Sequence, residues 1–176
     1  MTIPRLIRID DIPSTPWANG RGQTVELARH PASGAFAWRL SMATITAAAP
    51  FSSLAGVERA LMPMDGPLTL TVDGRPHRLT RHETVVFSGD ADVSVADPGD
   101  AQRDLNLMVR DGGRPTLTPA TVEGRLATPP GTVAAVVVEG DLTALGYRLR
   151  PGDAIVAGDG SAALRGSGTV VLAGVH

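Results

Sequence analysis

Short apolar runs, each only a few residues long, alternate with polar residues along most of the chain. Trp38 and Leu40, for example, alternate with Arg39 and Ser41 within the segment 36–46. A period of two is typical of a β-strand with one apolar face, and helical periodicity is scarce in this sequence. Twenty glycines and fourteen prolines separate the runs at intervals expected for a sandwich or barrel. The sequence therefore predicts an all-β fold.

The apolar runs and the breaks between them predict individual elements. We expect strands over segments 3–8, 24–28, 36–46, 58–64, 67–72, 84–87, 92–95 and 105–110. Asp73-Gly74, between two alternating runs, predicts a tight hairpin. The clearest interruption is the Gly-rich segment 111–115. We therefore expect two halves, residues 1–115 with the candidate site and a smaller half at 116–176, between which strands can be shared.

The second half faintly repeats the first. Two segments share the order of an apolar residue, an acidic residue, an apolar pair and a Gly/Asp turn: Leu79, Glu83, Val85, Val86 and Gly89-Asp90, then Leu149, Asp153, Ile155, Val156 and Asp159-Gly160. Upstream, the acidic-Gly turn at 64–69 has a counterpart at 138–143. Internal repetition suggests two related β-barrels in one chain. Because Gly-Asp turns are common in all-β proteins, chance similarity stays open as an alternative.

Composition and charge exclude several classes of partner. The net charge of the 176 residues is −2, and no basic cluster occurs, which argues against a nucleic-acid surface. The absence of cysteine excludes disulfides and thiolate metal sites. No signal peptide is evident, and no apolar run approaches the ~20 residues of a membrane span. We expect a cytoplasmic protein with no nucleic-acid or membrane partner, and a homodimer stays open.

The residues usually needed for metal binding or nucleophilic catalysis do not converge in this sequence. A metal site in a small barrel needs two or three histidines and a carboxylate on one face. His77 and His82 would face opposite sides of a continuous strand, and His30 and His176 lie far from them in sequence. No Gly-x-Ser-x-Gly motif, cysteine nucleophile or phosphate-binding loop is present. We therefore predict no metal, no other cofactor and no catalytic residue.

Polar residues within apolar strands are the best candidates for chemistry. In the segment 104–110, Asp104 and Asn106 share one face, while Arg39 and Arg59 lie in or next to other apolar runs. Arginine binds carboxylates through two parallel hydrogen bonds, and amides discriminate by the placement of donor and acceptor. With Asn19, such a pocket would suit a small dicarboxylate or an acylated amino acid.

Two simpler interpretations of the same residues remain open. Arg39 would lie on a solvated sheet face, or would form an ion pair with Asp104. Arg59 would similarly pair with Glu58, its neighbour in the sequence. In either case the charges would only stabilise the sheet.

At these positions the chain resembles the HutD/Ves family, bicupin proteins associated with histidine utilisation. The matching motifs, in the family's order, are Trp17-x-Asn19-Gly20-x-Gly22-x-Thr24-x-Glu26, Phe36-x-Trp38-Arg39-Leu40-Ser41-x-Ala43, Pro50-Phe51-Ser52 with Gly56-Val57-Glu58-Arg59, Phe87-x-Gly89-Asp90 and Asp104-x-Asn106-Leu107-Met108-x-Arg110. They cover residues 17–110, whereas the last third is similar only in being rich in Ala, Val and Gly. Arg21 departs from the pattern, because the family usually has glycine there.

The resemblance implies two packed cupin-like barrels in one chain, no required metal and a role in binding an acidic intermediate of histidine breakdown. N-formylglutamate is the ligand proposed for the family. The candidate ligand-binding residues are Trp17, Asn19, Arg39, Ser41, Arg59, Asp104 and Asn106. A non-catalytic binder is the leading hypothesis. The alternatives are a metal-independent cupin enzyme, an isomerase or hydrolase with Asp104 or Glu58 as base, and a β protein that binds only a protein partner.

Overall fold

The computed structural model describes residues 3–158 and 160–176, and it confirms the all-β prediction. Within these residues the one helical element is a short 3-10 helix, η1 (Ile9–Asp11). No helix in this part of the chain is long and apolar enough to cross a membrane. The chain forms two compact units: residues 13–115, called here the first unit, and residues 1–12 with 116–176, called the second unit.

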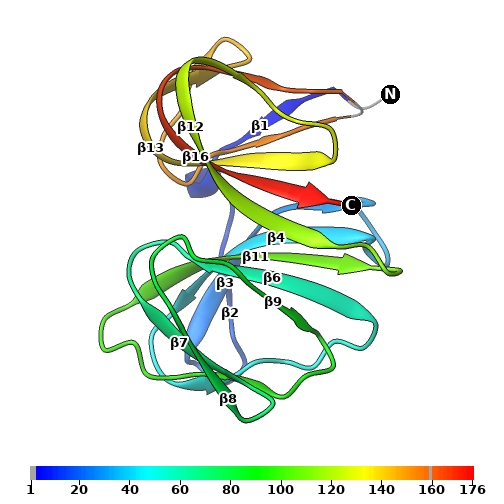
Figure 1. Cartoon of the computed structure of the whole chain (residues 1–176), viewed down its shortest axis with the longest axis vertical. Helices are drawn as coiled ribbons and strands as arrows, with labels where there is room; N and C mark the ends of the chain where they lie inside the picture. The colour runs from blue at the N-terminus through cyan, green and yellow to red at the C-terminus, as the bar shows by residue number, and fades with distance from the viewer. Residues whose placement is uncertain (1–2, 159) are drawn as a thin grey trace. The chain divides into compact units, whose positions relative to one another are not determined.

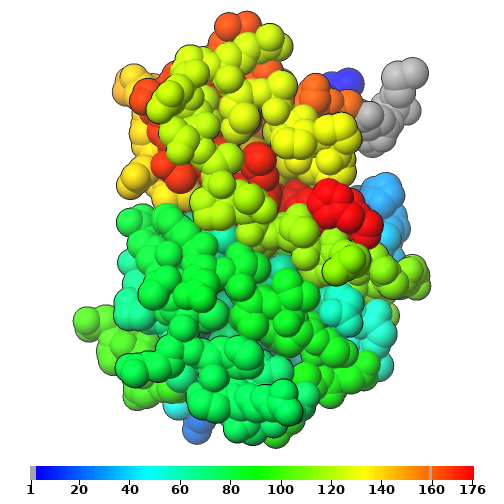
Figure 2. Space-filling view, viewed as in Figure 1, coloured from blue at the N-terminus to red at the C-terminus, as the bar shows by residue number. Residues whose placement is uncertain are grey.

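The first unit contains two antiparallel sheets (Figure 1). The larger is ordered β2 (Thr15–Pro16), β3 (Gly22–His30), β4 (Trp38–Ile45), β11 (Gln102–Arg110), β6 (Val57–Pro63) and β9 (Val85–Ser88). The smaller is ordered β5 (Ala49–Pro50), β10 (Val93–Val95), β7 (Leu68–Val72) and β8 (Arg75–Leu79). On the side that Figure 2 presents, the green segment that includes β7 and β8 forms much of the exterior of this unit.

The two sheets of the first unit enclose one apolar core. Its buried members come from both sheets: Ile45, Ala49, Leu61, Leu68, Leu70, Leu79, Phe87, Val93 and Val95. The opposite face of the larger sheet is also buried, since Leu40 and Leu105 are fully inaccessible. Arg39 and Ser41 therefore alternate with apolar residues on a strand that is covered on both faces. Their face of the strand is an interior one.

The expected hairpin at Asp73-Gly74 is confirmed. It joins β7 to β8, and the register places Val72 opposite Arg75. Asp73 and Gly74 have φ values of 47° and 76°, the left-handed conformations that a two-residue turn of this kind requires. Aspartate and glycine tolerate these conformations better than most residues do, and this is why the dipeptide predicts the turn.

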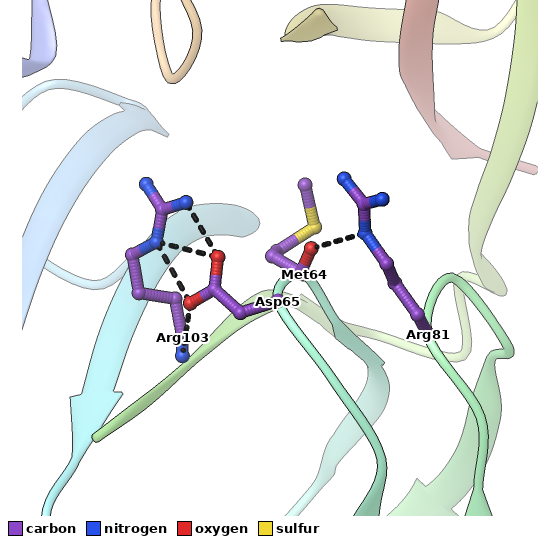
Figure 3. Close-up of polar contacts among 4 residues, drawn as sticks. All are labelled: Met64, Asp65, Arg81 and Arg103. Atoms are coloured by element: carbon purple, nitrogen blue, oxygen red, sulfur yellow. Dashed lines mark hydrogen bonds and ion pairs between the residues drawn. The ribbon is translucent and has the colours of Figure 1, made fainter. Parts of the chain in front are cut away.

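An ion pair fixes the connection between β6 and β7 (Figure 3). The carboxylate of Asp65 accepts hydrogen bonds from the backbone N–H of Arg103 at 2.9 Å and from its Nη2 at 2.6 Å. Arg81 Nε donates to the carbonyl oxygen of Met64 at 2.9 Å. These bonds from Arg103 lower the pKa of Asp65. The turn that follows β6 is thereby joined to the start of β11.

The second unit is a single sheet around its own core. The sheet is ordered β1 (Arg5–Ile7), β15 (Ala154–Val156), β13 (Thr132–Ala144), β16 (Ala163–Val175) and β12 (Pro115–Ala127), and β14 (Tyr147–Arg148) pairs with β13. Figure 1 shows β12, β13 and β16 as long, curved strands. The core includes Leu142, Ile155 and Leu164, each fully buried.

The first twelve residues belong to this second unit, whereas the sequence grouped them with residues 13–115. Leu6 pairs with Ile155 across β1 and β15. Arg8 Nη1 donates to Asp153 Oδ2 at 2.6 Å. The residues that form each of these contacts are about 150 positions apart in the chain, so no local sequence pattern predicts the contacts.

The faint repeat is only partly matched by the structure. Val85 and Ile155 both lie in short strands, β9 and β15, although Asp159 falls outside the described residues. The proposed turn at 138–143 is wrong, because β13 continues through it with a register shift between Val137 and Glu139. Gly140, with a φ of 113°, lies beside Gly168 and accommodates the irregularity, so the acidic-Gly pair marks a bulge here.

Candidate functional site

A cavity of about 590 Å³ lies within the first unit. Its wall consists of residues from the turn after β2, from β3, β4, β5, β6 and β11, and from the segment after β5: Trp17, Ala18, Asn19, Thr24, Arg39, Ser41, Ala43, Pro50, Phe51, Ser52, Leu54, Arg59, Asp104, Asn106 and Met108. All seven candidate residues from the sequence are among them. The structure therefore brings the whole predicted set together around one space.

Strand register determines how these side chains are arranged. Met108 lies opposite Arg39 on one side and Arg59 on the other, so the three form one row across β4, β11 and β6. Asn106 lies opposite Ser41 in the next row, and the row after it pairs Asp104 with Ala43. Residues directly opposite in neighbouring strands project to the same face. Two cations and two polar acceptors therefore share the cavity side of the sheet.

Arg39 is the more accessible of the two cavity arginines. Its Nε lies 2.8 Å from Glu26 Oε2, and about 30% of the side chain is exposed. The contact is an ion pair, although its angles do not make it a hydrogen bond. The expected pair between Arg39 and Asp104 is not formed. Glu26 provides the compensating charge from the adjacent strand.

Arg59 is buried, with 5% of the residue exposed. Its guanidinium carbon lies 5.1 Å from the ring centres of both Phe51 and Phe87. Nη1 makes a long hydrogen bond of 3.4 Å to the carbonyl oxygen of Ser52, while Nε has no partner. Burial lowers the pKa of Arg59 to about 10, against the attraction of Asp104. The group stays protonated at neutral pH, with hydrogen-bonding capacity left over.

Asp104 is more deeply buried still, at 1% exposed. Neither carboxylate oxygen has a hydrogen-bond partner among the residues that the structure describes. Burial raises the pKa of Asp104 to about 7, and the charge of Arg59 opposes this shift. An unpaired buried carboxylate is costly, so its retention calls for a reason other than packing.

Asn106 adds a second unsatisfied acceptor to the cavity. The residue is 5% exposed, and its Oδ1 has no hydrogen-bond partner. Ser41, opposite it on β4, is also buried. An amide and a hydroxyl in these positions can each donate or accept, so this row suits a polar, uncharged group.

The Trp17–Gly22 turn forms one wall of the cavity. Trp17 Nε1 donates to Thr24 Oγ1 at 2.8 Å, and the indole packs edge-on against Phe51. Asn19 is exposed, and its Oδ1 accepts the backbone N–H of Arg21 at 3.0 Å. Asn19 thus uses its carbonyl oxygen to hold the turn and keeps its NH₂ group for other contacts.

Arg21, the departure from the family pattern, is not part of the cavity wall. Its Nη1 donates to the carbonyl oxygen of Ala48 at 2.7 Å, and its own carbonyl accepts the backbone N–H of Thr46. The side chain therefore joins the glycine turn to the segment after β4.

Sequence reasoning missed two residues that shape this site. Phe51 contacts both Trp17 and Arg59, and its only signal was its place in the Pro50-Phe51-Ser52 motif. Glu26 has a signal only as a motif position, although it pairs with Arg39.

Glu58 is the residue that the sequence suggests as a base or as a partner for Arg59. It faces away from the cavity, because it alternates with Arg59 along β6 and lies opposite Val109 of β11. It does not line the cavity.

No group of three or more histidine, aspartate or glutamate side chains lies close enough to hold a metal ion in the part of the chain that the structure describes. His30 instead stacks on Trp38, with ring centres 6.3 Å apart. The absence of a required metal stays a prediction.

The cavity lies inside an all-β unit whose fold is similar to that of cupin proteins. The chain superimposes on a cupin 2 conserved barrel domain protein from Leptotrichia buccalis with a TM-score of 0.62, at 9% identity, over 100% of this chain and 98% of that chain. This similarity shows that the fold is cupin-like.

The HutD family model matches residues 9–172, so the chain belongs to the HutD family. The predicted resemblance is thereby confirmed. HutD from Pseudomonas fluorescens SBW25 is 28% identical, with a TM-score of 0.82, over 98% of this chain and 99% of that one. An uncharacterized 21.2 kDa protein in the hutC 3′ region of Pseudomonas putida is 41% identical over 108 residues. That match spans 59% of this chain and 57% of the relative, so the chain matches only a little over half of this curated relative.

Proposed function

We propose that the protein binds a small carboxylate-bearing metabolite in this cavity without transforming it. The observation that carries the proposal is Arg59, a buried cation. Among residues 3–158 and 160–176, its Nε has no hydrogen-bond partner and no carboxylate forms an ion pair with it. A guanidinium is suited to bidentate binding of a carboxylate. Arg39, in the same row, offers a second cation at the more open side.

The family suggests which metabolite to test. The relative in the hutC region supports a link to histidine breakdown, and N-formylglutamate is our proposed ligand. Its two carboxylates would match Arg39 and Arg59, and its formamide would match Asn106. We further propose that each unit forms a cupin-like barrel, that the protein is cytoplasmic and needs no metal, and that it forms a homodimer.

A thermal-shift screen of acids from histidine breakdown tests the proposal. A ligand present at ~100 times its Kd adds about 2.7 kcal/mol to the free energy of unfolding if the unfolded chain does not bind it. Arg59→Met should lose this response while retaining much of the side-chain volume. Arg78→Met serves as the matched control, because Arg78 is exposed on β8 and lies outside the cavity. An unchanged response in Arg59→Met would refute the assigned site.

Asp104 favours a second candidate function, a metal-independent enzyme. A buried carboxyl whose pKa is raised to about 7 is suited to accept and return a proton at neutral pH. Glu58 is not available for this role, since it does not line the cavity. NMR spectra of each bound acid, recorded over hours with wild type and Asp104→Asn, would reveal turnover. Product formation by wild type alone would replace the binding proposal with this one.

A further inference from the structure

Asp104 lies in the cavity wall without a polar neighbour in its own row of the sheet. It is opposite Ala43 of β4 and Pro63 of β6, and neither side chain can hydrogen-bond to it. Arg103, next to it in the chain, projects to the other face of β11 and pairs with Asp65. Among the described residues, both buried carboxyl oxygens of Asp104 therefore lack a hydrogen-bond partner.

The other charged groups around the cavity favour an anion. Arg59 of β6 and Arg39 of β4 line the same wall as Asp104. Glu26 of β3 compensates only Arg39, with its Oε2 lying 2.8 Å from Arg39 Nε. His77, on β8 of the smaller sheet, is not part of the wall. The arginines would attract a ligand carboxylate, whereas an ionised Asp104 would repel it.

A ligand carboxylate in the space between Arg59 and Asp104 changes the protonation of the site. Two carboxylates that share a buried site cannot both stay ionised without a large cost, so one of them takes up a proton. Burial already raises the pKa of Asp104 to about 7, although the charge of Arg59 opposes the shift. The carboxyl groups of a small acid titrate at about 4, so Asp104 is the group that is protonated.

We infer that Asp104 binds the ligand as a neutral carboxylic acid, which donates its O–H to a ligand carboxylate, and that ligand binding takes up one proton from solvent. The proton bonds to one oxygen of Asp104, and no covalent bond of the ligand changes. This inference rests on the proposed function of the cavity and needs only that the ligand carries a carboxylate. A buried carboxylic acid that stays neutral at pH 7 is a suitable donor to an oxyanion.

The arrangement makes affinity depend on pH in one direction. Below about pH 7 the empty site already holds the proton, so binding is tight and no proton is taken up. Above about pH 7 each binding event must first protonate Asp104, so affinity falls as pH rises. A carboxyl group that only stabilised the sheet would give no such dependence.

Isothermal titration calorimetry of wild type tests the inference. The probes are N-formyl-L-glutamate and glutarate, neither of which titrates between pH 6 and pH 8.5. We expect affinity to fall roughly 10- to 30-fold over this range, because the protonated fraction of Asp104 falls by that factor. Titration at pH 7.5 in two buffers of different ionisation enthalpy counts the protons, and we expect about 0.5–0.8 taken up per ligand.

Asp104→Asn shows whether this residue takes up the proton. Asparagine has the shape of the neutral acid and can donate from its NH₂ group at any pH. We expect its affinity to change by less than about threefold between pH 6 and pH 8.5, and to exceed that of wild type at pH 8.5. Asp100→Asn is the control, since Asp100 is exposed and outside the cavity, and it should behave like wild type. Circular dichroism establishes that both variants are folded.

The outcomes separate this inference from the proposed function. Probe binding that is independent of pH in wild type, with no proton taken up, would overturn the inference and leave the binding function intact. Proton uptake that persists in Asp104→Asn would overturn the assignment to Asp104. If neither acid binds to wild type at pH 6, the proposed function fails, and the inference fails with it.

Discussion

Arg59 and Asp104 face the same cavity from paired strands, yet no ion pair or hydrogen bond joins them. Both residues are almost fully buried. Breaking a buried pair by removing one partner is strongly destabilising, so two buried opposite charges that do not touch are a poor arrangement for stability. The arrangement is explained if a ligand occupies the space between them.

We expect Asp104→Asn to stabilise the empty protein above pH 7. The folded-state pKa of Asp104 is raised to about 7, from an unfolded value of about 3.9. Removing the buried charge would increase the free energy of unfolding by at most about 4 kcal/mol, because one pKa unit corresponds to about 1.4 kcal/mol. Thermal unfolding of wild type and variant at pH 8 measures the difference.

The sign of the pH dependence follows from the same pKa. Between about pH 4 and pH 7 the folded state binds more protons at Asp104 than the unfolded state does, so this residue makes the protein less stable as pH rises through that window. The variant should lose this contribution, and Asp100→Asn should retain it. A variant that is less stable than wild type at pH 8 would show that Asp104 has an unrecognised structural partner.

Arg39→Lys and Arg59→Lys should each weaken carboxylate binding by roughly tenfold or more. Lysine keeps the charge but not the planar pair of donors, and the loss of one charge-assisted hydrogen bond typically costs about 1.5–3 kcal/mol. Folding stability should change little, because most of the aliphatic stem is retained. Calorimetry and thermal unfolding on both variants provide the two quantities. If the melting temperature falls while affinity is unchanged, the arginines act only as structural residues.

Asp65→Asn should destabilise the protein at neutral pH by about 1 kcal/mol, a modest value because the pair with Arg103 is partly exposed. The pKa of Asp65 is lowered, so its stabilising contribution is present above its unfolded pKa and is lost as pH falls through the folded one. Urea unfolding at pH 7 and pH 3 should therefore show a larger difference between wild type and variant at pH 7 than at pH 3. An equal difference at both values would exclude the charge of Asp65 as the cause.

Gly22→Ala should disturb the cavity wall, whereas Gly20→Ala should affect only the turn. A Cβ at Gly22 would lie 2.7 Å from the Thr44 carbonyl oxygen and 3.0 Å from the Trp17 ring, so the indole must move. Gly20 has open space around it but a φ of 69°, which costs an alanine about 1 kcal/mol. Tryptophan fluorescence and ligand affinity should change in Gly22→Ala and not in Gly20→Ala. Identical spectra for the two variants would contradict the close contact.

The residues of the candidate site could be selected from the sequence because their chemistry conflicts with their surroundings. Arg39, Asp104 and Asn106 lie in apolar strands, where a polar side chain needs a partner or a ligand. The period of two also assigned each of them to one face of its strand. What could not be predicted was the pairing between strands, since Arg39 and Arg59 are brought into one row only by the registers of β4, β11 and β6.

By itself, the sequence determined the all-β class, the hairpin at Asp73-Gly74 and the set of polar residues with an interior face, because these depend on local conformation and on alternation along one strand. Tertiary structure alone decided that Glu26 compensates Arg39, that Asp104 remains unpaired and that β1 joins β15. These outcomes depend on which segments, distant in the chain, become neighbours. Burial and electrostatics act between such neighbours, and no local pattern records them.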